Sequence, residues 1–165
     1  MGFRRIFITV GTTYFTDLIT VVKSPEMAEV LRDLDCEEMT VQSGKESLKF
    51  GEEFDGIATN VYSVALSIEE DIKEADLVIS HAGAGTCIEV LKHKKPLIVV
   101  INDSLMGNHQ VELAHQLASE GVLIYCSPGK LLDTLRQFDP ADLETYQEGS
   151  PENFIRELDK LMGFC

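Results

Sequence analysis

The sequence predicts an open, doubly wound α/β fold with a mostly parallel sheet. Short apolar runs rich in Ile and Val recur along the chain, and most of them lack the alternation of a half-exposed strand, as expected of strands covered on both faces. Stretches with helical spacing lie between these runs. The chain has 165 residues, of which 44% are apolar, which suits one domain, 1–165, with an ordinary core.

The strands are expected at the apolar runs. They are 5–10 (RIFITV), 38–42 (EMTVQ), 56–62 (GIATNVY), 76–80 (DLVIS), 96–102 (PLIVVIN) and 121–126 (GVLIYC).

The clearest helix is SPEMAEVLRDL, where we expect Ser24 to cap the N-terminus and Pro25 to take the first helical position. Its apolar residues lie on one face. Further helices are expected near 15–22, 66–75, 86–94, 108–119, 129–137 and 152–162. The longest expected loop is 43–56, and the chain from Pro140 to Pro151 is expected to be irregular.

Charge and cysteine content exclude several classes of function. The net charge of −14 would repel a nucleic-acid backbone or an anionic membrane surface. The four cysteines, Cys36, Cys87, Cys126 and Cys165, form no C-x-x-C pair and have no His at metal-ligand spacing, so we expect reduced thiols and no metal site. The N-terminal apolar run, 6–10, is too short for a signal peptide or a membrane span, which predicts a cytosolic protein.

Ligands of such sheets bind where parallel strands lead into helices, and the first candidate loop is VGTTYF. Gly11 follows a strand, and Thr12 and Thr13 offer hydroxyl and N–H groups before a helix. A contact to a phosphate and an ordinary turn both fit this loop.

The second loop, DLVISHAGAGTCIEVL, contains two glycines that permit a sharp turn and a close approach to a ligand, Gly83 and Gly85. The N–H groups of Ala84, Gly85 and Thr86 then open a helix whose positive end suits a diphosphate. Glu89 lies one turn later, placed to accept hydrogen bonds from ribose hydroxyls. The alternative is an acid that only complements the helix dipole, and spacing alone favours this alternative.

The same run partly matches the dinucleotide fingerprint G-x-G-x-x-G, but Ile88 stands where the third glycine or alanine belongs. Asp103 follows at roughly the distance of a ribose-binding acid. The match comes late in the chain with no second domain after it, which weakens the interpretation as an NAD-type oxidoreductase.

The third loop is NDSLMGNHQVELAHQL, where Asn108, His109 and Gln110 gather at a helix start. They suit contacts to sugar hydroxyls, and N-capping by Asn108 with exposed neighbours explains them equally well. His81 lies beside the glycine turn, where a general base would be useful; a hydrogen bond to a neighbouring loop is the alternative role.

Together VGTT, DLVISHAGAGTCIEVL and KPLIVVINDSLMGNHQVELAHQL resemble the catalytic subunit of the two-subunit UDP-N-acetylglucosamine transferase of dolichol-linked oligosaccharide synthesis. That family is similar to the C-terminal, donor-binding half of MurG-type glycosyltransferases of family 28 with the GT-B fold, a Rossmann-like domain. The resemblance runs from about Arg5 to Tyr125.

The resemblance implies a role for each loop in binding the donor. Gly11, Thr12 and Thr13 form the first glycine-loop contact. Gly83, Ala84, Gly85 and Thr86 place helix N–H groups against the diphosphate, Glu89 takes the ribose, and His109 with Gln110 meets the N-acetylglucosamine ring. Bacterial members have a longer Gly-Gly-Ser loop in place of 11–13 and Gln in place of His109.

The implied reaction transfers N-acetylglucosamine from UDP-N-acetylglucosamine to N-acetylglucosaminyl-diphosphodolichol, with inversion and without a metal or other cofactor. His81 is the candidate base within this chain, and the base can also come from the other subunit. The resemblance also implies a membrane-anchored partner that supplies the acceptor-binding half and recruits the chain to the cytosolic face of the endoplasmic reticulum. The apolar face of 152–162 suits docking on that partner or packing on its own sheet.

Two alternatives remain from the sequence. One is a nucleotide-sugar-binding or scaffold protein without catalysis, and the other is the NAD-type oxidoreductase.

Overall fold

The computed structural model describes residues 2–46, 48, 53–101 and 109–146, with the backbone alone for 109–111. Its described part contains a seven-stranded sheet with strand order β3-β4-β2-β1-β5-β6-β7. Every neighbouring pair is parallel except β3 and β4. The strands are β1 (Arg5–Thr9), β2 (Glu38–Gln42), β3 (Glu53–Phe54), β4 (Ile57–Tyr62), β5 (Leu77–His81), β6 (Leu97–Val100) and β7 (Ile124–Cys126).

The predicted doubly wound, mostly parallel sheet is therefore confirmed. The helices are α1 (Thr16–Val22), α2 (Pro25–Asp33), α3 (Glu69–Glu74), α4 (Ala84–Lys92), α5 (His109–Ser119) and α6 (Leu131–Gln137), with 3-10 turns η1 (Pro128–Lys130) and η2 (Pro140–Asp142). The helix predicted at 152–162 lies outside the described residues.

Helix α2 begins where its capping signal predicts. The Ser24 side chain accepts a hydrogen bond from the Met27 N–H at 3.2 Å, and Pro25 opens the helix. The predicted apolar face of α2 is buried. It consists of Met27, Val30, Leu31 and, just beyond the helix, Leu34.

The loop predicted at 43–56 is partly wrong, because its end forms β3, which pairs antiparallel with β4. Asp55 and Gly56 connect the two strands with φ of 52° and 85°, the two positive values of a type I′ hairpin turn. An Asp-Gly pair is a hairpin signal that the interpretation of this segment as a loop overlooked.

Two apolar cores lie on opposite faces of the sheet, because successive side chains of a strand point to opposite sides. Ile6 and Ile8 of β1 face one core, which α1, α2 and α6 cover. Phe7 faces the other core, which α3, α4 and α5 cover. Coverage of both faces explains why the strands read as continuous apolar runs.

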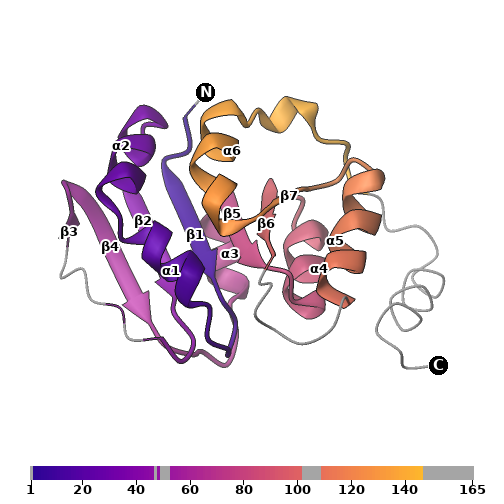
Figure 1. The fold of residues 1–165 in the computed structure, drawn as a ribbon, viewed down its shortest axis with the longest axis horizontal. Coiled ribbons are helices and arrows are strands. Elements are labelled where there is room, and N and C mark those ends of the chain that lie inside the picture. Colours follow the sequence, from indigo (N-terminus) through magenta and orange to yellow (C-terminus); the bar gives the residue numbers. More distant parts are fainter. Residues whose placement is uncertain (1, 47, 49–52, 102–108, 147–165) are drawn as a thin grey trace.

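The strand order places a topological switch point between β1 and β5 (Figure 1). From β1 the chain adds β2 and β4 on one side, and then returns to add β5, β6 and β7 on the other. Thr9 pairs with Ser80, so the loops that leave β1 and β5 are neighbours. In open α/β sheets this crevice outside the carboxyl ends of the strands is where ligands bind.

Candidate donor site at the carboxyl ends of the strands

The structure brings together the first two candidate loops at the switch point. The loop from Gly11 follows β1, and the turn at Gly83 follows β5. We call the carboxyl ends of β1, β2, β4 and β5 with their following loops the carboxyl edge; in Figure 1 the arrowheads of β1 and β4 point to the lower side of the molecule, where this edge lies.

Buried polar side chains gather beneath this edge. Of the described polar and charged residues, those that are buried are Thr9, Gln42, Ser43, Ser80 and His81. All five lie in the last residues of β1, β2 and β5 or directly after them. Burial of a polar group is costly unless the group is hydrogen-bonded. A cluster of buried polar side chains at one edge of the sheet therefore indicates a functional site.

The Gly11 loop is held by its own hydrogen bonds. The Gly11 N–H donates to Thr9 Oγ1 at 3.0 Å, and Thr9 Oγ1 donates to Gln42 Oε1 in the next strand. Thr13 Oγ1 donates to the Val10 carbonyl at 3.0 Å. Thr12 between them is exposed, so its hydroxyl is accessible to a ligand.

The turn after β5 opens α4 without a side-chain cap. Gly83 takes the N-cap position in extended conformation, and no side chain bonds to the first turn of the helix. The N–H groups of Ala84, Gly85 and Thr86 therefore lie at the positive end of a nine-residue helix with no capping side chain, a suitable place for an anion. A Cβ built on Gly85 would meet no atom within 4 Å, so the space in front of it is open.

Glu89 is half-buried on the same helix. Residues four apart lie on one helix face, which places Glu89 one turn behind Gly85 on the side that faces the open space.

His81 ends β5, and only 8% of its surface is exposed. Its ring hydrogen-bonds to the Thr9 backbone, and Ser80 Oγ lies 3.4 Å from Nδ1. Burial lowers the pKa of His81 below 6.5, and the bond to Thr9 offsets this only in part, so the ring is neutral at pH 7.

The third candidate loop is only partly described. His109 and Gln110 begin α5 as predicted, next to the carboxyl end of β6, but their side chains are outside the described residues. Asp103 and Asn108 are outside them as well.

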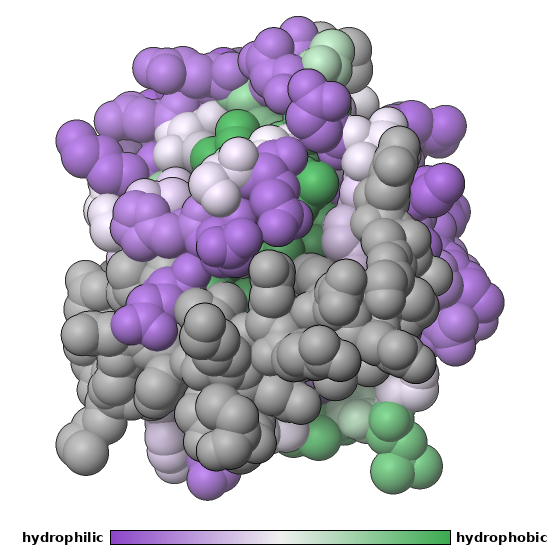
Figure 2. Space-filling view, turned by 90° about the vertical axis from the view of Figure 1, so that its right-hand side faces the viewer, coloured by the Kyte–Doolittle hydropathy of each residue, from purple (hydrophilic) through white to green (hydrophobic). Residues whose placement is uncertain are grey.

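Exposed apolar side chains line the outer part of the carboxyl edge. Tyr14, Val64 and Leu66 are the exposed large hydrophobic residues among those described. Their loops lie side by side, because the Lys45 N–H donates to the Thr13 carbonyl at 3.2 Å and the Gly44 N–H donates to the Ser63 carbonyl at 2.9 Å. In Figure 2 the coloured surface is mostly hydrophilic, with a hydrophobic area at the lower right.

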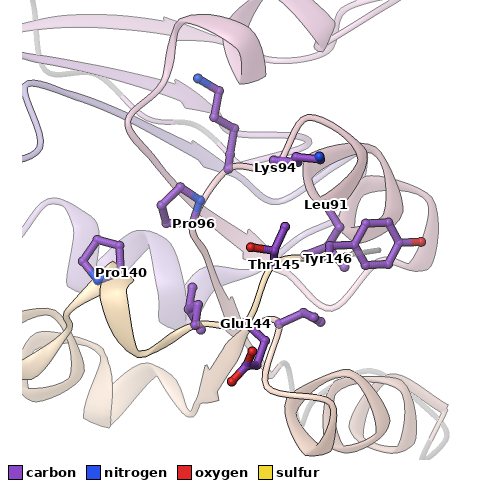
Figure 3. A pocket seen from close by; sticks show the side chains of 10 residues that line it. Leu91, Lys94, Pro96, Pro140, Glu144, Thr145 and Tyr146 are labelled. Carbon is purple, nitrogen blue, oxygen red and sulfur yellow. The ribbon is translucent and has the colours of Figure 1, made fainter. Parts of the chain in front are cut away.

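A pocket of about 260 Å³ lies elsewhere, at the amino ends of β6 and β7 (Figure 3). Leu91, Pro96, Pro140 and Tyr146 line it, together with residues that include Lys94, and none of the predicted site residues does.

Sequence reasoning missed Gln42 and Ser43. The signal was present, because three strands end in the same way: Thr9 precedes Gly11, Gln42 and Ser43 precede Gly44, and Ser80 precedes the turn at Gly83. A polar residue followed by glycine at each strand end predicts that these loops meet on one edge.

Cys36, Cys87 and Cys126 are buried free thiols, as predicted, and Cys165 is outside the described residues. Within the described ranges we find no helix with the length and apolar character needed to cross a membrane.

Comparisons with known proteins agree with this fold. The profile of the Glycosyltransferase family 28 C-terminal domain matches residues 5–162. The human protein named UDP-N-acetylglucosamine transferase subunit ALG13 is 48% identical over 126 residues, which is 75% of this chain but 11% of the human protein. A protein of the same name from Cryptococcus neoformans is 28% identical over 96% of both chains. The chain thus spans only a small part of the human relative.

Two solved structures share the fold. The NMR solution structure of ALG13 superposes with a TM-score of 0.69 at 26% identity, covering 95% of this chain and 96% of that chain. The crystal structure of Acinetobacter baumannii MurG superposes with a TM-score of 0.68 at 19% identity, covering 97% of this chain and 50% of that chain. This chain thus has the Rossmann-like fold of one half of a GT-B glycosyltransferase, and with the family match over 5–162 it belongs to the glycosyltransferase family 28 C-terminal domain family.

Proposed function

We propose that this chain is the donor-binding subunit of a glycosyltransferase that takes UDP-N-acetylglucosamine. The observation that carries the proposal is the uncapped first turn of α4, which opens at the switch point opposite the Gly11 loop. The name of the human relative, a UDP-N-acetylglucosamine transferase subunit, supports the choice of donor.

The diphosphate binds at the N–H groups of Ala84, Gly85 and Thr86. A net charge of −14 does not prevent this, because the helix end supplies a local positive potential and directed donors. Thr12 faces the same crevice from the other loop and contributes a hydroxyl. As the bond to the sugar breaks, negative charge grows on the UDP, and the same N–H groups stabilise it.

Glu89 accepts hydrogen bonds from the ribose hydroxyls. Its position one turn into α4 places the nucleoside along the helix face, with the sugar directed toward the start of α5. His109 and Gln110 at that helix start contact the N-acetylglucosamine ring.

The acceptor is N-acetylglucosaminyl-diphosphodolichol. Its hydroxyl oxygen attacks the anomeric carbon from the face opposite UDP, the bond from that carbon to the diphosphate oxygen breaks with its electron pair on UDP, and a base takes the hydroxyl proton. The reaction needs no metal, because the helix N–H groups bear the leaving-group charge.

The burial of His81 does not favour its role as this base. A general base must come within hydrogen-bond reach of the acceptor hydroxyl, whereas His81 is only 8% exposed and its ring packs against Gly11 and Gly83. We therefore place the base on the partner subunit.

A partner supplies the acceptor-binding half and the attachment to the endoplasmic reticulum membrane. Two facts support a partner: the human relative is named a transferase subunit, and the carboxyl edge exposes Tyr14, Val64 and Leu66 beside the donor site. Apolar side chains grouped at one edge are typical of a surface that another protein covers.

The proposal is tested first by titrating the protein with UDP-N-acetylglucosamine, UDP and NAD while following the amide chemical shifts of Gly11, Gly85, Thr86, Glu89 and Gln110. We expect shifts with the two uridine nucleotides and none with NAD. Shifts with NAD would transfer the chain to the oxidoreductases. Silence with all three nucleotides would refute donor binding by this chain.

Glu89→Ala tests the ribose contact. We expect the Kd for UDP to rise about tenfold to a hundredfold with unchanged folding, because one charge-assisted hydrogen bond contributes about 1.5–3 kcal/mol. Glu29→Ala, an exposed helical glutamate on α2, is the matched control and should leave binding unchanged. Equal affinities of the Glu89→Ala and wild-type proteins would remove Glu89 from the site.

The alternative of a non-catalytic nucleotide-sugar-binding protein predicts the same titration. Reconstitution in membranes that contain the partner subunit distinguishes a binding protein from a catalytic subunit. A chain that binds UDP-N-acetylglucosamine there but transfers no sugar to the lipid acceptor is a binding protein.

A further inference from the structure

The imidazole of His81 is packed between the two glycine loops of the donor site. A Cβ built on Gly11 would lie 2.8 Å from both Cε1 and Nε2 of the ring. A Cβ built on Gly83 would lie 2.4 Å from Nε2. Both distances are shorter than real Cβ contacts, so the ring fills the space that side chains at 11 and 83 would need.

The ring is also tied to both strands. It belongs to β5 through its own backbone, and it hydrogen-bonds to the backbone of Thr9 in β1. Thr9 in turn holds the Gly11 N–H through its hydroxyl and bonds to Gln42 of β2. A side-chain hydrogen bond therefore joins β1 to β2 beside the ring, at the carboxyl ends of the strands.

The identity of Gly11 and Gly83 depends on the neighbouring ring of His81. Gly11 has a φ of 66°, which already favours glycine, and the neighbouring ring adds a steric reason. Gly83 has φ −72° and ψ 126°, values that any residue adopts, so the only demand for glycine there is the approach of the ring.

We propose that His81 is a positioning residue whose buried imidazole is a spacer that sets the separation between the Gly11 loop and the first turn of α4. The inference rests on the proposed function, because it is the donor diphosphate that binds between these two elements. The spacer acts through the loops and does not take the acceptor proton.

The electrostatics of the ring agree with a steric role. Burial lowers the pKa of His81, so the ring carries no charge at pH 7 and offers no positive charge to a phosphate. The ring therefore affects donor binding through the shape of the crevice.

A double-mutant cycle tests the spacer. The variants are His81→Ala, Gly83→Ala and the two together, compared by denaturant unfolding and by UDP titration. We expect Gly83→Ala to lower stability when His81 is present and to leave it equal or higher when His81 is replaced by Ala, because the added methyl then enters the vacated space. Gly85→Ala, whose Cβ meets nothing within 4 Å, is the matched control and should have the same effect in both backgrounds.

Binding supplies the second measurement. We expect His81→Ala to raise the Kd for UDP about tenfold without any acceptor present, since the two loops lose their fixed separation. A residue that acts only as a base would lower kcat and leave UDP affinity unchanged. If His81→Ala does not fold, His81→Asn takes its place, because it also removes the ring but keeps a side-chain N–H donor.

The outcomes separate the two proposals. If the effects of His81→Ala and Gly83→Ala on the free energy of unfolding are additive, the spacer proposal is wrong. It is also wrong if the two effects are coupled but His81→Ala leaves the Kd for UDP unchanged. Failure of the wild-type protein to bind UDP would instead refute the donor site, whatever the coupling.

Discussion

Gly83→Ala and Gly85→Ala place the same methyl group two residues apart, and the structure predicts opposite effects on stability. Gly83 precedes α4 and its Cβ would lie 2.4 Å from His81 Nε2. Gly85 lies in the first turn of α4 and its Cβ would meet no atom within 4 Å. Neither glycine has a positive φ, so the backbone of both positions admits alanine. Gly83 is the N-cap of α4, where glycine is preferred to alanine, and this adds to the cost of the steric contact.

The magnitude follows from these distances. The His81 ring is buried between Gly11 and Gly83, so it has little room to move, and overpacking of this kind costs about 1–3 kcal/mol. At Gly85 the change gains about 0.5–1 kcal/mol of helix propensity. The free energies of unfolding of the two variants should therefore differ by roughly 1.5–4 kcal/mol, or about 3–16 °C in Tm.

Urea unfolding followed by circular dichroism measures the first effect, and UDP titration measures the second. We expect Gly85→Ala to be at least as stable as the wild-type protein yet to bind UDP about tenfold more weakly, because the methyl occupies the space in front of the helix N–H groups. A Gly85→Ala protein less stable than Gly83→Ala would refute the packing described around His81. A stable Gly85→Ala protein with undiminished UDP affinity would place the diphosphate elsewhere.

Three further predictions concern stability and reactivity. Ser24→Ala should lower the free energy of unfolding by about 1 kcal/mol, measured by urea unfolding, because α2 loses its capping bond to the Met27 N–H, and an unchanged midpoint would contradict that cap. Below pH 6.5 His81 is protonated in the unfolded chain but stays neutral in the folded chain, because burial lowers its pKa. The free energy of unfolding should therefore fall by up to about 1.4 kcal/mol per pH unit until the pH reaches the lowered pKa of the folded state. His81→Asn should lack this part of the pH dependence in unfolding midpoints taken from pH 7 to 5, and an identical slope in both proteins would show that other groups cause it. Burial raises the pKa of Cys87 to about 12, so iodoacetamide at pH 8 should label this thiol, as detected by mass spectrometry, only after denaturant is added, whereas rapid native labelling would contradict its burial.

Much of the fold is encoded in short stretches of sequence. The capping signal at Ser24 and the uninterrupted apolar strands each predict structure within a few residues, and the structure confirms them. The Asp55-Gly56 pair shows that the hairpin of β3 and β4 was equally available from a local signal. Its omission came from reading the polar segment 43–56 by its polarity alone.

The extent of α3 was predicted less well. The apolar spacing of 66–75 predicts a longer helix than Glu69–Glu74, and Leu66 is instead fully exposed in the loop before it. Ser67 Oγ accepts the Glu69 N–H at 3.2 Å and so provides a hydrogen bond at the start of the helix. A competition between a side chain and the backbone of this kind decides a helix boundary more than periodicity does.

Some features of the candidate site could likewise be predicted from the sequence, and others could not. Gly11, Gly83 and Gly85 stand out in the sequence as turns after strands, and the uncapped helix start at 84–86 follows from the same stretch. That Gly11 and Gly83 enclose one imidazole does not follow from either stretch, because it depends on β1 pairing with β5.

By itself the sequence determined the alternation of strands and helices, the glycine turns and the residues at the start of α4, since all of these arise from interactions between residues close in the chain. Only the tertiary structure decided that the loops after β1, β2 and β5 meet over buried polar side chains and that His81 is one of them. The physical reason is that strand order and burial result from the packing of residues far apart in the sequence, and the environment created there sets the exposure, the pKa and therefore the role of a side chain.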